Sequence, residues 1–286
     1  MGVFKAAAVQ MRSGTDVARN AKAMEELVRE AAAKGAVYVQ TPEMTGALMK
    51  DRESLRASLK SDQQDLIYQA AQRLAKELGI HLHVGSTAIA RPDGKVANRA
   101  FLFDPSGALT ATYDKIHMFD VDLDNGESWR ESATYEPGTA SVVADLGFAR
   151  VGLAICYDVR FPQLFRAEAL SGAEVLTAPA AFTRQTGEAH WHILQRARAI
   201  ENGAWMISAA QAGLHEDGRE TFGHSLIVDP WGKIIAELDS GEPGIVVAEI
   251  DTAAAAAARR KVPNLKNARE FAVTTTGETA PLRAAS

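Results

Sequence analysis

The chain has 286 residues, 47% of them hydrophobic and 23% charged, so it can bury a sizeable core and is not disordered as a whole. Thirty-one basic and thirty-six acidic residues give a net charge of −5, which argues against a nucleic-acid partner. The single cysteine, Cys156, excludes an internal disulfide, and no apolar run reaches the ~20 residues of a membrane span. We therefore expect a cytoplasmic protein without nucleic-acid or membrane partners.

Strand and helix patterns alternate along nearly the whole chain, which predicts an α/β layered domain. In the N-terminal half, strand patterns occupy residues 4–11, 36–41, 80–88, 96–103 and 108–113. One helix is expected from a cap at Thr15 or Asp16 to Gly35, and a second from a cap at Ser61 to Gly79. Turn residues at 92–94 and 105–107 predict antiparallel hairpins, so the sheet is mixed.

A polar stretch at 117–138 follows these strands, and we expect it to line the functional site. Beyond it, strand patterns occupy 141–147, 149–156, 174–178, 204–211, 222–229, 233–238 and 245–250, and helix patterns occupy 162–171, 190–202 and the alanine-rich run after 251. No linker divides these patterns. We expect one domain over residues 1–262 and a C-terminal extension over 263–286, at an oligomer interface.

The only thiol stands where a strand pattern meets a turn. Residues 151–158 form an apolar strand that reaches Cys156, and Pro162 opens the next helix. Such a corner lifts a nucleophile out of the sheet edge and leaves the next backbone N–H, that of Tyr157, to face a developing oxyanion. A lone cysteine also packs well as a small buried hydrophobe, so the position alone leaves both interpretations open.

A reactive thiol needs a base or a cation close by, because the thiolate is the nucleophile. Glu43 follows the strand at 36–41, and Lys115 closes the strand at 108–113. Open α/β sheets place ligands at the ends of their strands, so Glu43 and Lys115 are candidates for the base and the cation. Considered alone, Lys115 is more simply interpreted as a solvated surface lysine. If Cys156 is an enzyme nucleophile, we expect it to react well below the ordinary thiol pKa of about 8.5.

Three segments together resemble the signature motifs of the nitrilase superfamily, the carbon–nitrogen hydrolases with a Glu, Lys and Cys triad. They are residues 42–43 (PE), 113–120 (YDKIHMFD) and 156–162 (CYDVRFP). Residues 180–201 resemble the branch that contains deaminated glutathione amidase and omega-amidase. The resemblance implies a single-domain, four-layer αββα sandwich with mixed sheets, assembled as a homodimer or higher homo-oligomer, with no metal and no organic cofactor.

The resemblance also implies a mechanism in which a small linear amide bearing a carboxylate is cleaved to an acid and ammonia through a thioester. Cys156 attacks the amide, Glu43 transfers the protons, and Lys115 holds the oxyanion. A lysine that stays charged in a dry site needs carboxylates beside it. The second glutamate of the family lines up with Glu131, and Glu127 is the competing position.

Arg160 resembles a carboxylate clamp, because a guanidinium binds a carboxylate through two parallel hydrogen bonds. The alternative is a structural salt bridge to Asp158 or Glu168. Tyr157, through its backbone N–H, and Thr183 and Thr186 are further candidates for contact with the substrate. The alternative for the two threonines is that their hydroxyls make hydrogen bonds only within their own loop.

The seven histidines show no spacing typical of a metal site. His81 and His83 share one face of a strand, and His190 and His192 flank Trp191, but no HExxH motif or cysteine partner accompanies them. Structural roles are therefore favoured.

Three alternative functions stay open at this point. One is an omega-amidase acting on 2-oxoglutaramate or related dicarboxylate monoamides. Another is an N-carbamoyl amidohydrolase, and the third is a catalytically idle interaction protein that uses the sandwich as a binding surface.

Overall fold

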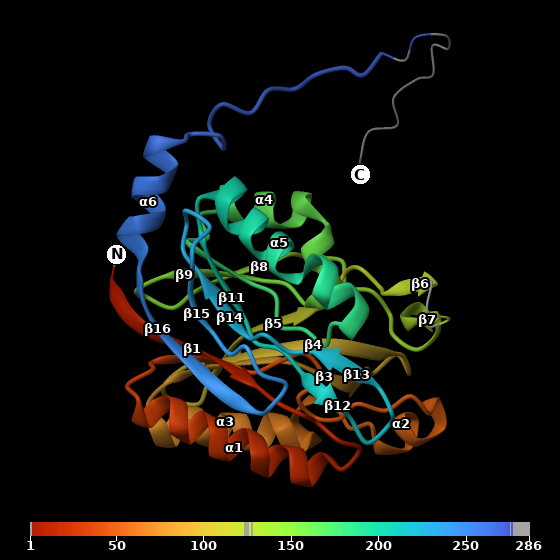
Figure 1. Cartoon of the computed structure of the whole chain (residues 1–286). Coiled ribbons are helices and arrows are strands. Elements are labelled where there is room, and N and C mark those ends of the chain that lie inside the picture. The colour runs from red at the N-terminus through yellow and green to blue at the C-terminus, as the bar shows by residue number, and fades with distance from the viewer. Residues whose placement is uncertain (1, 123–125, 127, 275, 277–286) are drawn as a thin grey trace.

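Two six-stranded sheets stack face to face, and helices cover the outer face of each, as Figure 1 shows. The structure is a computed structural model that describes residues 2–122, 126, 128–274 and 276. The predicted single-domain αββα sandwich with mixed sheets is confirmed. In the part of the chain described, none of the helices has the length and apolar character needed to cross a membrane.

The first sheet has the order β16-β1-β2-β3-β4-β5 and is covered by helices α1 and α3. Its elements are β1 (Val3–Gln10), α1 (Val17–Ala33), β2 (Tyr38–Gln40), α3 (Leu66–Leu78), β3 (His81–Ala90), β4 (Val96–Phe103), β5 (Leu109–Asp114) and β16 (Gly244–Asp251). Strands β1, β2 and β3 are parallel, whereas β3, β4 and β5 form antiparallel hairpins. The mixed character follows from helical crossovers in one part and tight turns in the other.

The second sheet has the order β15-β14-β11-β10-β9-β8 and is covered by helices α4 and α5. Its elements are β8 (Val142–Asp145), β9 (Arg150–Leu153), α4 (Pro162–Leu170), β10 (Val175–Thr177), α5 (Arg184–Asn202), β11 (Trp205–Ser208), β14 (Leu226–Val228) and β15 (Ile234–Glu237). The last helix, α6 (Thr252–Lys261), ends near the predicted domain boundary at 262. The role of the extension after that boundary stays a prediction.

Smaller elements lie toward the right-hand side of the sandwich in Figure 1. They are α2 (Arg52–Ser58), β6 (Asp120–Asp122), β7 (Ser128–Arg130), β12 (Ala212–Leu214) and β13 (Glu220–Phe222). The chain also forms short 3₁₀ helices at Asp62–Gln64, Glu131–Ala133 and Cys156–Arg160. The stretch at 117–138 thus contains a short β6–β7 ribbon and a helical turn rather than being wholly irregular.

The core forms two apolar layers because side chains of a strand alternate between its faces. On β1, Ala6 and Ala8 point between the two sheets, where they join Leu176 and Ile207 of the second sheet. The intervening Ala7 and Val9 pack under α1 and α3. A strand with apolar residues at every position is therefore one that is covered on both faces.

Two predicted helix starts are wrong. Helix α3 begins after Asp65, whose carboxylate accepts the Ile67 and Tyr68 N–H groups, while Ser61 precedes only a 3₁₀ turn. Helix α5 begins at Arg184 instead of residue 190. Its first turns contain Gly187, although glycine is a poor helix former. Glycine is needed at this position because any side chain would collide with Phe222.

The predicted strand at 222–229 is also divided in the structure. Strand β13 ends at Phe222 and β14 begins at Leu226, because Gly223 and His224 adopt left-handed backbone angles, with φ of 75° and 59°. Consecutive residues with positive φ break the extended pattern of a strand.

Candidate active site

The structure brings together the three residues expected at strand ends. Glu43 lies in the loop after β2, Lys115 directly follows β5, and Cys156 lies three residues after β9. The ammonium of Lys115 lies 2.9 Å from Oε1 of Glu43, and the Glu43 carboxylate and the Cys156 thiol are close enough for each to shift the pKa of the other. Two of these strands belong to the first sheet and one to the second, so the site spans both sheets.

Lys115 is buried between two carboxylates. Its Nζ donates to Glu43 and to both oxygens of Glu131, at 3.0 and 2.8 Å from the latter, although only 2% of the lysine is exposed. Burial alone would lower the pKa of Lys115, but the charges of Glu131 and Glu43 hold that pKa well above its ordinary value. The lysine is therefore a fixed positive charge. Glu131 occupies the place expected of the second glutamate, and Glu127 lies outside the described residues.

Backbone and amide donors fix both carboxylates. Nδ2 of Asn98, in the middle of β4, donates to Glu43 at 2.9 Å and to Glu131 at 3.2 Å. The Ala181 N–H donates to the other oxygen of Glu43 at 2.9 Å, and the Phe119 N–H donates to Glu131 at 2.7 Å. Sequence reasoning missed Asn98, and the signal that could have found it is an amide in a strand pattern whose only other polar residue is Arg99.

Glu43 is ionised and placed to accept a proton. Its burial would raise the pKa, but the Lys115 ammonium and the hydrogen bonds from Cys156, Lys115 and Asn98 hold the pKa of Glu43 below its ordinary value. A buried carboxylate that faces a thiol has the position and charge of a general base.

Cys156 occupies a sharp corner of the backbone. Its φ is 51°, a left-handed value that costs energy in any residue with a side chain, and its N–H donates to the Pro179 carbonyl at 2.9 Å. Burial and the Glu43 carboxylate raise the pKa of the thiol well above its ordinary value, although Lys115 opposes this. The resting sulfur is therefore protonated, which is opposite to the expectation of a low thiol pKa.

Asp158 ties the cysteine corner to the segment that carries Lys115. Its carboxylate accepts the Ile155 N–H at 2.9 Å, the His117 N–H at 3.0 Å and the Tyr113 hydroxyl at 2.7 Å. All three donors are held by a side chain with no exposed surface. Asp158 therefore fixes the two motifs relative to each other.

Arg160 lines the pocket without a carboxylate partner among the described residues. Its guanidinium lies 3.2 Å from Nδ1 of His190 and 5.4 Å from the centre of the Phe182 ring. The carboxylate of Asp158 accepts hydrogen bonds from Ile155, His117 and Tyr113 instead. Burial raises the pKa of Glu168 well above its ordinary value, so Glu168 is neutral. Neither forms the salt bridge that was the alternative for Arg160.

The remaining predicted binding residues also line the pocket. The hydroxyls of Thr183 and Thr186 lie 2.8 Å apart and hydrogen-bond to each other, as their alternative interpretation expected. The ring of Tyr157 packs edge-on against Phe119 at 5.1 Å. An oxyanion role for the Tyr157 N–H stays a prediction.

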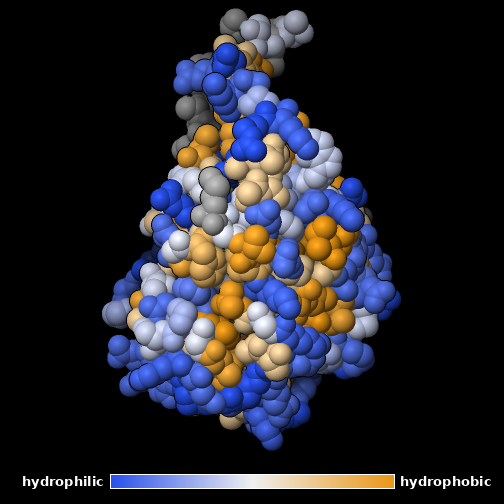
Figure 2. Space-filling model, turned by 90° about the vertical axis from the view of Figure 1, so that its left-hand side faces the viewer, coloured by the Kyte–Doolittle hydropathy of each residue, from blue (hydrophilic) through white to orange (hydrophobic). Residues whose placement is uncertain are grey.

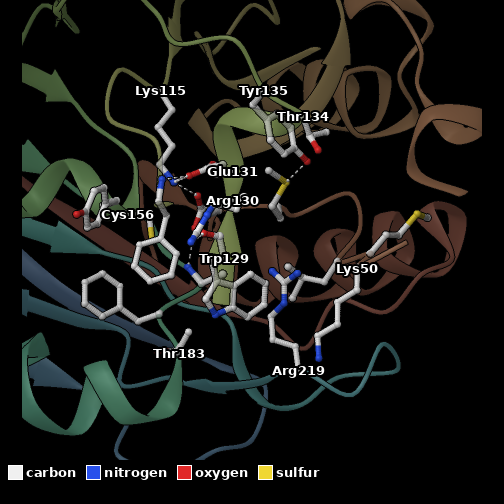
Figure 3. A pocket seen from close by; sticks show the side chains of 18 of the residues that line it. Lys50, Lys115, Trp129, Arg130, Glu131, Thr134, Tyr135, Cys156, Thr183 and Arg219 are labelled. Atoms are coloured by element: carbon white, nitrogen blue, oxygen red, sulfur yellow. Dashed lines mark hydrogen bonds and ion pairs between the residues drawn. The ribbon is translucent and has the colours of Figure 1, made fainter. Parts of the chain in front are cut away.

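The pocket has a volume of about 490 Å³ and a strongly cationic wall. Figure 3 shows Lys115, Glu131 and Cys156 at one end, with Lys50 and Arg219 at the opposite end. Arg219 stacks over the Trp129 ring at 4.5 Å. Lys50 and Arg219 suit a substrate that carries negative charge at the end away from Cys156, whereas Glu43 and Glu131 already offset the charge of Lys115.

The chain resembles known proteins along nearly its whole length. A family model described as "Carbon-nitrogen hydrolase" matches residues 5–260. The "Deaminated glutathione amidase" of Yersinia enterocolitica is 39% identical over 266 residues, which cover 92% of this chain and 92% of that protein.

Solved structures show the same fold. The C. elegans NitFhit protein superposes with a TM-score of 0.86 at 32% identity, over 94% of this chain and 66% of that chain. A glutamate-to-glutamine mutant of the amidase from Nesterenkonia sp. AN1 has a TM-score of 0.77 at 26% identity, over 93% of this chain and 94% of that chain. That mutant carries the acetamide moiety of fluoroacetamide covalently added at its active site cysteine.

The raised thiol pKa can be tested by titration, because Cys156 is the only cysteine. Burial and Glu43 both disfavour the thiolate, so its ultraviolet absorbance should develop only above the ordinary pKa of about 8.5. Glu43→Gln removes the nearby negative charge but leaves Lys115, so the thiol pKa should fall relative to wild type. Cys156→Ala provides the blank. A thiolate signal at neutral pH in wild type, or a higher pKa in Glu43→Gln, would contradict this account.

Proposed function

Because the chain belongs to the carbon–nitrogen hydrolase family and is a cysteine amidase of the nitrilase superfamily, we propose that its substrate is a small linear amide bearing a carboxylate, such as deaminated glutathione. The observation that carries this proposal is Arg160. Its guanidinium lies in the pocket of the candidate nucleophile, where the described residues provide it with no carboxylate. A substrate carboxylate would satisfy it through two parallel hydrogen bonds.

In the proposed first half-reaction, the sulfur of Cys156 attacks the amide carbon while Glu43 receives the thiol proton. Lys115 and the Tyr157 N–H hold the resulting oxyanion. Glu43 then gives its proton to the amide nitrogen, the carbon–nitrogen bond breaks, and the acyl group remains on Cys156 as a thioester. The raised thiol pKa supports this order of events, because a protonated sulfur needs the adjacent base.

In the second half-reaction, Glu43 takes a proton from a water molecule that attacks the thioester carbon. The carbon–sulfur bond breaks, the acid leaves, and the sulfur recovers the proton from Glu43. Lys115 keeps its charge throughout. Glu131 and Asn98 position it and Glu43 without themselves transferring protons.

The leaving group depends on the amide. A primary amide such as 2-oxoglutaramate releases ammonia, whereas hydrolysis of deaminated glutathione at the corresponding bond releases the amine of cysteinylglycine. The second substrate carries carboxylates at both ends. The size of the pocket and the cations Lys50 and Arg219 opposite Cys156 favour this longer dianion over 2-oxoglutaramate.

We also propose a cytoplasmic homo-oligomer. A lone thiol that must stay reduced suits a reducing compartment.

Helix α5 exposes Ile193 and Ile200, seven residues apart on one face, at 68% and 52% exposure, and Leu170 on α4 is exposed as well. Figure 2 shows further apolar residues in patches on the side of the molecule that lies at the left in Figure 1.

Self-association is expected to depend on the α5 face. Ile193→Glu should shift the protein toward monomers in light scattering, because it places a charge within the proposed contact. Leu214→Glu changes a similarly exposed leucine on β12 and should leave the molar mass unchanged. A monomeric wild type would contradict the oligomer.

Removing the nucleophile or the base should stop turnover of deaminated glutathione. Cys156→Ala is expected to reduce hydrolysis to background, and Glu43→Gln to reduce kcat by about 10²- to 10⁴-fold, the usual contribution of a general acid–base. Glu26→Gln, an exposed glutamate on α1, should be fully active. Thermal unfolding of each variant checks that the fold is intact, and full activity of either site variant would reject the mechanism.

The substrate proposal is tested by comparing the two amides and by changing Arg160. Product assays should detect cysteinylglycine from deaminated glutathione and ammonia from 2-oxoglutaramate, with the higher kcat/KM for the former. Arg160→Lys should raise KM for carboxylate-bearing amides by about 10-fold, because a point charge cannot reproduce the bidentate fork.

A neutral amide without a carboxylate serves as the control substrate for Arg160→Lys, and its kinetics should not change. An unchanged KM for the charged amides would remove the clamp from the proposal. If wild type turns over neither of the two amides, the substrate assignment is wrong.

A further inference from the structure

Three non-glycine residues in the described part of the chain have left-handed backbone angles: Met44, Cys156 and His224. Cys156 is the candidate nucleophile, and Met44 follows the candidate base and also lines the pocket. Residues held in such conformations cluster at functional sites, because the surrounding structure must impose them. His224, with φ of 59°, is outside the pocket and lies beside two other side chains that can bind metals.

These three side chains come from separate elements and converge on one point. His192 is on α5, His224 precedes β14, and Glu237 ends β15. Oε1 of Glu237 lies 2.6 Å from Nδ1 of His224 and 2.7 Å from Nε2 of His192. One donor atom of each residue lies within 4.8 Å of the other two. The side chains are 23–33% exposed, so an ion from solvent can reach them.

We propose that His192, His224 and Glu237 form a binding site for a divalent transition-metal ion of the zinc class. Two imidazole nitrogens and one carboxylate oxygen are a donor set that zinc takes in proteins, with water completing the tetrahedron. The ion would replace the two hydrogen bonds that the imidazoles make to Oε1 of Glu237, and each imidazole would then carry its proton on the other ring nitrogen.

Binding of the ion would require the three donor atoms to rearrange. Bonds of about 2.0–2.1 Å to each donor place tetrahedral ligand atoms roughly 3.3 Å apart. Oε1 of Glu237 would therefore move away from each imidazole by roughly 0.6 Å, and the two imidazole nitrogens, which lie within 4.8 Å of each other, would have to reach the same roughly 3.3 Å spacing.

Neighbouring groups already hold both imidazoles in place. The Phe222 ring stacks on His224 with centroids 4.2 Å apart, and it meets the His192 ring edge-on at 5.8 Å. The indole N–H of Trp191 donates to the backbone carbonyl of His224 at 2.8 Å. Such outer contacts orient metal ligands and reduce the ordering cost of binding.

The bound ion would join a helix to the edge of a sheet. Strand β15 is the outermost strand of the second sheet, and α5 covers the face of that sheet. The ion would thus restrain both against local opening. Because none of its three ligands lines the pocket, the proposal assigns the ion a stabilising role and no part in hydrolysis.

The test uses the full chain, freed of metal with a chelator and titrated with zinc chloride in a calorimeter. One ion per chain should bind to wild type. His224→Asn and His192→Ala should each weaken binding by at least about 10- to 100-fold, a loss that even outer-contact changes can produce. Asparagine is chosen at position 224 because it tolerates the left-handed backbone. Zinc should raise Tm in wild type and not in these variants.

Two controls separate this site from other metal-binding groups. Glu188→Gln removes an exposed carboxylate from the same helix and should bind zinc as wild type does. Cys156→Ala should also keep the site, and cobalt bound to wild type should show tetrahedral visible bands without a thiolate charge-transfer band.

Several results would overturn the proposal. They are the absence of binding to wild type, equal affinity in wild type and both histidine variants, and loss of binding in Cys156→Ala, which would place the ion in the pocket. If His224→Asn fails to fold, His192→Ala, which changes a partly exposed side chain of α5, still decides the outcome. None of these results depends on which amide the enzyme cleaves.

Discussion

A buried ammonium between two carboxylates is the interaction on which the site depends. Burying three charged groups is costly unless each is paired and hydrogen-bonded, and here Lys115, Glu43 and Glu131 satisfy one another, with Asn98 donating to both carboxylates. Removing Lys115 would leave two carboxylates without a counter-charge in a dry environment. The cluster therefore determines both the electrostatics of the pocket and the stability of the loops that build it.

The cluster also explains why the site requires the complete sandwich. Glu43 and Lys115 follow strands of the first sheet, and Cys156 follows a strand of the second, so they meet only when the sheets stack. Asp158 joins the cysteine corner to the end of β5, and the Ala181 N–H joins the second sheet to Glu43. The fold and the site therefore form together, and an error in sheet register would separate these three side chains.

Features with local causes could be predicted from the sequence. Periodicity and turn residues indicated most strands, and their ends located Glu43, Lys115 and Cys156, whereas Glu131 was inferred from resemblance. Features set by distant neighbours could not be predicted: the need for glycine at position 187, in the first turns of α5, depends on Phe222, and the direction of the thiol pKa depends on burial and Glu43. The His192–His224–Glu237 cluster was missed because its members share no sequence spacing.

The protonated sulfur bears on how the protein survives between catalytic cycles. Peroxides and other electrophiles attack thiolates far faster than thiols, so a cysteine that keeps its hydrogen is a poor target for them. Under the proposed mechanism, the sulfur would become reactive only while an amide carbonyl is in place to receive the electron pair. A chain with a single cysteine, and therefore no second one to repair it by disulfide exchange, would gain resistance to oxidative inactivation from this arrangement.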